Sequence, residues 1–202
     1  MNKKDDIGCD LRFQPRRLNR TVELVISNIP GGGVVRKDDF KTTSTEMKEG
    51  ALLGVDQDGI YHLTKTAEIY HAAASGATDI TVSKNHEFKT GDIITNTSKT
   101  AISRAIAAVT NSDISWDTIT LEDPLGVALS PDDVLIQASA SEASGSEASF
   151  KYSPVAVATN PVNLLANNTG CGLMVRGDVK ESLMPYPVDG TLKDLLPLIR
   201  FV

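Results

Sequence analysis

Short stretches of alternating apolar and polar residues, separated by turn-forming residues, recur along most of this sequence. The segment TVELVISNI (21–29) alternates in this way, and EGALLGVDQDGIYHL (49–63) reads as two strands joined by a tight Asp-Gly turn. Two further segments, 79–94 and 118–136, share one plan: an Ile-Thr strand, a polar connection, then an acidic turn that leads into a second apolar strand. This pattern predicts a mainly-β chain with little helix.

The acidic turn of the second copy, within ALSPDDVLIQ (128–137), places Asp132 and Asp133 side by side. Pairs of carboxylates also occur in metal sites and in acid–base catalysts, so the two aspartates are either a functional pair or part of a turn. Pro131 fixes φ at a value suited to a turn, and Ser and Asp side chains bond to nearby backbone amides. Residues 132 and 133 would point to opposite sides of a strand that began there, so they cannot share a metal or a proton. The sequence predicts a turn here.

The N-terminal part differs in composition from the rest, and we predict an extended arm over residues 1–41 ahead of a β-rich body over 42–202. Residues 11–20 carry four arginines and no acid. Apolar residues among the arginines would anchor a strap that orders on a partner, while a disordered tail is the alternative. The residues of this predicted binding arm are Arg12, Phe13, Arg16, Arg17, Leu18 and Arg20.

Three glycines, Gly31, Gly32 and Gly33, follow the first predicted strand. A phosphate-binding loop needs Lys followed by Ser or Thr after its last glycine, whereas VVRKDDF follows here. Because glycine's main use is conformational freedom, we predict a hinge between the arm and the body.

The charge of the chain limits its classes of partner, and its cysteine content indicates its cellular compartment. The net charge of −6 and the pI of about 5.1 argue against nucleic acid as the main partner. Residues 111–150 hold eight acids and no Lys or Arg, so we expect a negative surface there that complements the basic arm in neighbouring copies. Cys9 and Cys171 are expected to be free thiols in a reducing cytoplasm. No stretch is apolar enough for a signal peptide or a membrane span, so we expect no membrane partner.

The sequence shows none of the usual catalytic, metal-binding or cofactor-binding patterns. His62, His71 and His86 lie far apart, with no HExxH pair, and no Gly-x-Ser-x-Gly elbow occurs. The stretch DQDG has its glycine at the fourth position of a would-be calcium loop, where the sixth is required. We expect no enzyme, no cofactor and no metal site, with a small carboxylate-dependent hydrolase as one alternative.

Several motifs, in order, resemble the head-decoration proteins of tailed phages. They are KEGALLGVDQDGIYHL, then DTITLEDPLGVALSPDDVL, then SPVAVATNPVNLLANNTGCGLMVRGDVKESLMP, and together they cover roughly residues 46–186. The resemblance implies a small β-barrel or β-tulip-like domain that forms homotrimers on the outer capsid surface. The implied partners are the major capsid protein and other head proteins, with assembly in the host bacterial cytoplasm, and no catalytic residues are carried over.

The sequence is compatible with more than one role for the chain. The basic arm, the loop ASASEASGSEAS and the tail LKDLLPLIRFV depart from the shorter family members, so the chain is either a plain clamp or the capsid-anchoring base of a head fibre. An alternative function is a surface module that binds host glycans. Its candidate stacking residues are Trp116, Tyr61, Tyr70, Tyr152 and Tyr186.

Overall fold

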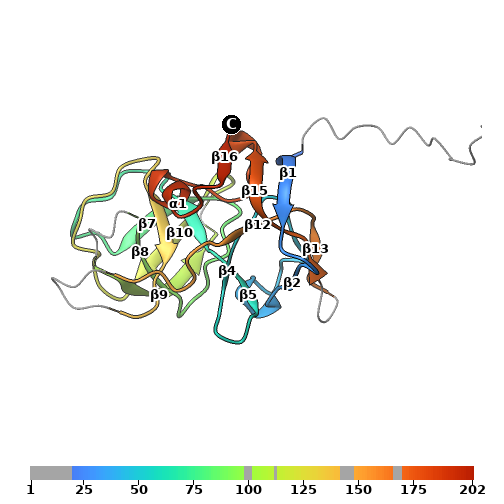
Figure 1. Ribbon diagram of the computed structural model, residues 1–202. Coiled ribbons are helices and arrows are strands. Elements are labelled where there is room, and N and C mark those ends of the chain that lie inside the picture. The colour runs from blue at the N-terminus through green and yellow to red at the C-terminus, as the bar shows by residue number, and fades with distance from the viewer. Residues whose placement is uncertain (1–19, 98–101, 112, 142–147, 166–169) are drawn as a thin grey trace, which may run out of the picture.

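A computed structural model describes residues 20–97, 102–111, 113–141, 148–165 and 170–202 (Figure 1). Strands make up 42% and helices 7%, so the prediction of a mainly-β chain with little helix is confirmed. The strands form two six-stranded sheets and two short strand pairs. The two large sheets lie side by side (Figure 1), and Ile136 of the second sheet packs among buried residues of the first, such as Leu52 and Val157.

The first sheet combines strands from both ends of the described chain. Its order is β1 (Val22–Asn28), β15 (Leu173–Val179), β12 (Ala156–Ala158), β4 (Leu52–Val55) and β5 (Tyr61–Leu63), all antiparallel, and β16 (Ile199–Phe201) runs parallel to β15. The strands predicted at 21–29 and within 49–63 are therefore confirmed. Among the described residues β1 pairs with β15 alone, so it forms one edge of the sheet (Figure 1).

The second sheet is built from one continuous part of the chain that lies between β5 and β12. Its order is β6 (Thr66–Glu68), β11 (Val134–Gln137), β8 (Ile93–Asn96), β9 (Arg104–Thr110), β10 (Trp116–Leu121) and β7 (Asp79–Ser83), with every pair antiparallel. Corresponding strands of the two similar segments pair with each other, β7 with β10 and β8 with β11. The internal similarity read in the sequence is therefore a structural repeat.

The second sheet curls without closing. Its two end strands, β6 and β7, meet through one isolated bridge between Ile69 and Val82, and the Tyr70 N–H donates to the Thr81 carbonyl. Twelve buried apolar side chains fill the inside of the curl, including Phe88 and Ile119. The fold is thus close to the small barrel that the resemblance implied, but the structure has an open sheet in place of a closed barrel.

Shorter elements lie before and after the segment that forms the second sheet. They are the strand pairs β3 (Glu46–Met47) with β13 (Val162–Asn163) and β2 (Gly33–Val34) with β14 (Gly170–Cys171), the 3₁₀ turns Lys37–Asp39 and Glu181–Leu183, and the helix α1 (Gly190–Asp194). The Asp189 carboxylate accepts the Leu192 N–H at 3.0 Å and so caps α1. Leu192 then packs on the first sheet among Val179 and Ile199.

The SPDD segment is a turn, as predicted. Asp132 has φ +71°, the left-handed conformation that Asp tolerates well. The Asp133 carboxylate accepts the Ser130 N–H at 2.7 Å, and the Asp133 N–H donates to the Ser130 carbonyl. Both residues are exposed, and strand β11 begins at Val134.

The proposed arm boundary at residue 41 needs correction, because residues 20–41 belong to the body. Strand β1 pairs with β15 along its length, and Val22, Val35 and Phe40 are buried in the cores. The sequence indicated a strand at 21–29 but not its partner, because β15 lies more than 100 residues further along the chain. The rest of the predicted arm, residues 1–19, lies outside the described residues.

Candidate functional site

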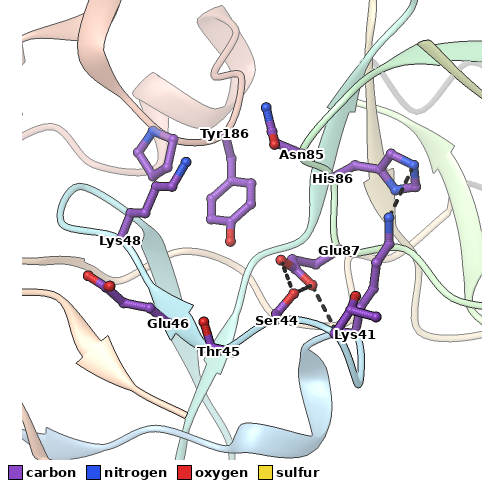
Figure 2. A pocket seen from close by; sticks show the side chains of 11 residues that line it. Lys41, Ser44, Thr45, Glu46, Lys48, Asn85, His86, Glu87 and Tyr186 are labelled. Atoms are coloured by element: carbon purple, nitrogen blue, oxygen red, sulfur yellow. Dashed lines mark hydrogen bonds between the residues drawn. The ribbon is translucent and has the colours of Figure 1, made fainter. Parts of the chain in front are cut away.

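Two cavities lie next to each other where the second sheet meets residues 41–48 and 181–189. Their volumes are about 450 Å³ and about 550 Å³, and both are lined by Asn85, His86, Pro185 and Tyr186. We treat them as one groove with two halves. Figure 2 shows the first half, with Tyr186 in its centre between Lys48 on one side and Asn85 and His86 on the other.

The first half of the groove is organised by the buried carboxylate of Glu87. It accepts the Lys41 N–H at 2.8 Å and the Ser44 hydroxyl at 2.9 Å (Figure 2). Burial, together with the nearby Glu87 carboxylate, raises the pKa of Tyr186 above its ordinary value of 10.0, so its phenol stays protonated at neutral pH. The polar groups on this wall bind one another, which makes them a structural support for the groove.

His86 is also held in a fixed state. Its Nδ1 accepts the Phe88 N–H at 3.2 Å, which leaves the proton on Nε2, 3.2 Å from the Asp117 carboxylate. Burial, and next the neighbouring Lys41 ammonium, lower the pKa of His86 to about 4. The imidazole is therefore neutral near pH 7 and is a hydrogen-bonded part of the wall. Asp117 also pairs with Lys84 and is itself buried, so it does not contribute to the negative surface expected over 111–150.

The second half of the groove is rich in carboxylates and hydroxyls. Ser83, the last residue of β7, donates to Glu68 at the end of β6 across 3.4 Å. The Thr66 hydroxyl donates to the Pro187 carbonyl at 2.8 Å and ties β6 to the opposite wall. The remaining acids that line this half are Asp132, Glu181 and Asp189. It offers many hydrogen-bond acceptors to a polar ligand.

An aromatic cluster lies beside Ser83 on the outer face of the second sheet. The Tyr70 and Trp116 rings stack with centroids 5.1 Å apart, and His71 contacts both edge-on at 4.8 Å and 5.0 Å. Tyr70 is 39% exposed. Of the five aromatic residues named from the sequence, the fold brings Tyr70 and Trp116 together. Tyr186 lines the groove, Tyr152 stacks on His62, and Tyr61 lies against Gly33.

Strand β1 carries a second exposed surface of a different kind. Its residues after Val22 are all exposed, and three consecutive ones are apolar: Leu24 at 49%, Val25 at 41% and Ile26 at 54%. An apolar edge strand of this kind is a site where another chain can pair or pack.

Two buried charged clusters were missed by sequence reasoning. The His62 ring lies between Asp39, 2.9 Å from Nδ1, and Asp56, 3.1 Å from Nε2. The Lys65 ammonium, almost fully buried, lies 2.7 Å from the Asp92 carboxylate. Asp56 and His62 lie in one hairpin, but the fold brings Asp39 to His62 over 23 positions and Asp92 to Lys65 over 27 positions, which no local pattern indicates. Among the described residues, no group of three or more His, Cys, Asp or Glu side chains is arranged to hold a metal ion.

The structure describes all three glycines of the predicted hinge but only one of the residues named for the predicted arm. Arg12, Phe13, Arg16, Arg17 and Leu18 lie outside the described residues, as does Cys9, while Arg20 is exposed. Gly31, with φ +81°, and Gly32, with φ +67°, form a tight turn between β1 and β2. A Cβ on Gly32 would collide with the Cys171 carbonyl, and one on Gly33 with the Tyr61 ring. These glycines permit close packing within the body, so the structure gives no support for a hinge there.

Comparisons with known proteins add no relative. No family model, curated protein or solved structure matches the chain.

No helix among the described residues is long and apolar enough to cross a membrane. Cys171 is a free, buried thiol, and burial raises its pKa to about 11.

Proposed function

We propose that the protein is a non-enzymatic structural protein of a phage virion, which decorates the outer capsid surface and stabilises it as a homotrimer. The observation that carries this proposal is the exposed apolar edge of β1. A seven-residue edge strand with Leu24, Val25 and Ile26 in water favours aggregation unless another chain covers it. Together with the motif resemblance over residues 46–186, this supports a subunit that works within an assembly.

The proposed mechanism is mechanical. Covering apolar surface between subunits raises the work needed to pull capsomers apart, at about 25 cal/mol per Å² before the cost of association. Strand β1 would lie in a contact with a neighbouring copy or with the major capsid protein. The basic residues that precede it, among them Arg16, Arg17 and Arg20, would run along an acidic part of the shell and bind other head proteins if the chain anchors a fibre.

The test uses the purified full-length chain and empty capsids from a virus that lacks it. We expect native mass spectrometry to give a trimer at micromolar concentration, and co-sedimentation to show binding to the capsids. The variant Ile26→Glu puts a charge into the exposed edge and should abolish one or both associations. Leu198→Glu, which changes a side chain that is 61% exposed outside β1, is the matched control.

Either loss in Ile26→Glu identifies the contact that β1 makes. A wild-type chain that stays monomeric and does not bind capsids would overturn the proposal. The same holds if Ile26→Glu assembles and binds as well as the wild type, because the edge would then have no partner.

A further inference from the structure

The aromatic cluster of Tyr70, His71 and Trp116 owes its position to the alternation of side chains on the second sheet. On β10, Trp116 and Thr118 face outward while Asp117 and Ile119 are buried. Trp116 pairs with Ser83 of β7, and the Tyr70 N–H bonds to Thr81 on the other side of that strand. The rings therefore come from both sides of β7 and meet above its short side chains.

The cluster is not required by the apolar core. The inside of the second sheet is filled by aliphatic residues and Phe88, which lie on the opposite face from Trp116. The Tyr70 ring stacks on Trp116, and His71 stands edge-on to both. Because Tyr70 and His71 are exposed, these two rings present the aromatic surface of the cluster to solvent. Exposed apolar surface gathered in one place indicates a binding surface more often than scattered exposed residues do.

The aromatic surface is continuous with the groove. Ser83 pairs with Trp116 across the strands and also lines the second half of the groove, together with its partner Glu68. A ligand that lies on the rings and extends past Ser83 therefore enters the half of the groove that is lined by Glu68, Asp132 and Asp189. The site combines a stacking platform at one end with an elongated, acceptor-rich cavity.

We propose that this platform and groove bind a neutral polysaccharide. A pyranose ring presents a face of C–H groups that packs on an aromatic ring, and its hydroxyls donate to carboxylates along the chain. Four acids line the second half of the groove against one lysine, Lys84, so this half disfavours anionic sugars and nucleic acid and fits a neutral chain best. This proposal is independent of capsid decoration, because the site uses none of the β1 surface.

The experiment takes advantage of Trp116, which is the only tryptophan in the chain. We expect its fluorescence to change on titration with neutral hexasaccharides, namely cellohexaose, chitohexaose or maltohexaose. Affinity should rise from the monosaccharide to the hexasaccharide, since longer chains also reach the groove. A heparin hexasaccharide, which is anionic, should bind at least tenfold more weakly than the best neutral chain. Saturation-transfer NMR replaces the fluorescence titration for any variant in which Trp116 itself is substituted.

Variants distinguish stacking of the saccharide on the aromatic cluster from nonspecific binding. Tyr70→Ala should weaken binding at least tenfold, and Glu68→Gln several-fold, with unchanged melting temperature. Ile114→Ala removes a side chain that is 92% exposed in the same β9–β10 hairpin and should bind like the wild type.

The proposal is overturned if no neutral chain is bound at roughly 10 mM, which is too weak for a specific site. It is also overturned if Ile114→Ala loses as much affinity as Tyr70→Ala. A third contrary result is loss of capsid binding in Tyr70→Ala without any saccharide binding by the wild type, since the rings would then be a protein contact.

Discussion

Removing one partner of the ion pair between Lys65 and Asp92 should destabilise the fold far more than removing one partner of a surface pair. The Lys65 side chain is almost fully buried, and its ammonium lies 2.7 Å from Asp92. Asp92 also accepts the Lys89 N–H at 2.9 Å and the Gln137 amide at 2.8 Å. Replacing Asp92 by Ala leaves a buried cation without this partner, so we expect a loss of about 3–5 kcal/mol in the free energy of unfolding.

A matched control has the same ion-pair distance but lies at the surface. The Arg200 guanidinium is 2.7 Å from the Asp178 carboxylate, and the Arg200 side chain is 72% exposed. Asp178→Ala should therefore lower stability by at most about 1 kcal/mol. Urea denaturation followed by Trp116 fluorescence measures both variants. If Asp92→Ala is no more destabilised than Asp178→Ala, the reasoning about burial is refuted.

The pH dependence of Asp92→Ala gives a second check. Burial lowers the pKa of Lys65 below its ordinary value of 10.5, and removing Asp92 removes the charge that opposes this shift. The unfolded chain then binds more protons than the folded chain, so the stability of the variant should rise as pH increases toward 10.5. The double variant Lys65→Met/Asp92→Ala should recover most of the loss and show no such rise, because it buries no charge.

Three further predictions concern the core, a buried histidine and the glycine turn. Phe88→Ala should lower stability by about 3–5 kcal/mol in chemical denaturation, because it empties the centre of the second sheet. The pKa of His86, about 4 when folded against 6.5 ordinarily, means that the unfolded chain binds more protons in this range, so stability should fall from pH 6.5 to 4. His86→Asn should flatten that fall, and an unchanged acid profile would contradict the assignment. Gly31→Ala, in open space at φ +81°, should lose about 1–2 kcal/mol, and Gly32→Ala clearly more, whereas a hinge predicts equally small effects on melting temperature.

The sequence was sufficient to predict several strands and a turn, but it was insufficient to predict the groove and the aromatic cluster. The local sequence pattern located β1, β4, β5, β7 and β10. Of these strands, β7 and β10 bury alternate residues, so their period-two pattern has a direct structural cause. The turn at 130–133 followed from Pro131 and the side-chain preferences of Ser and Asp. The apolar spacing around residues 102–109 fits a helix as well as a strand, and residues 104–110 form β9 because β8 and β10 pair with it on both sides.

The groove could not be predicted because its walls come from three distant segments. The hydrogen bond from Thr66 to Pro187 joins residues 121 positions apart, and no local pattern marks either of them. The aromatic cluster had a partial signal, since Trp116 and Ser83 stand at outward positions of alternating strands. That these two strands are neighbours, and that Tyr70 lies across β7, depends on the register of the curled sheet.

The two exposed surfaces lie on different sheets, and this arrangement fits a protein with one face toward an assembly and another toward solvent. Strand β1 is at the outer edge of the first sheet, while β7 and β10 lie on the opposite side of the molecule (Figure 1). A neighbour that covers Leu24 and Ile26 would therefore leave the aromatic platform accessible. If both proposals hold, assembled protein should bind neutral polysaccharide with several platforms at once, and its apparent affinity should exceed that of the Ile26→Glu monomer through multivalency alone. Equal apparent affinity of the assembled and monomeric forms for an immobilised polysaccharide would show that the platforms do not face the same side.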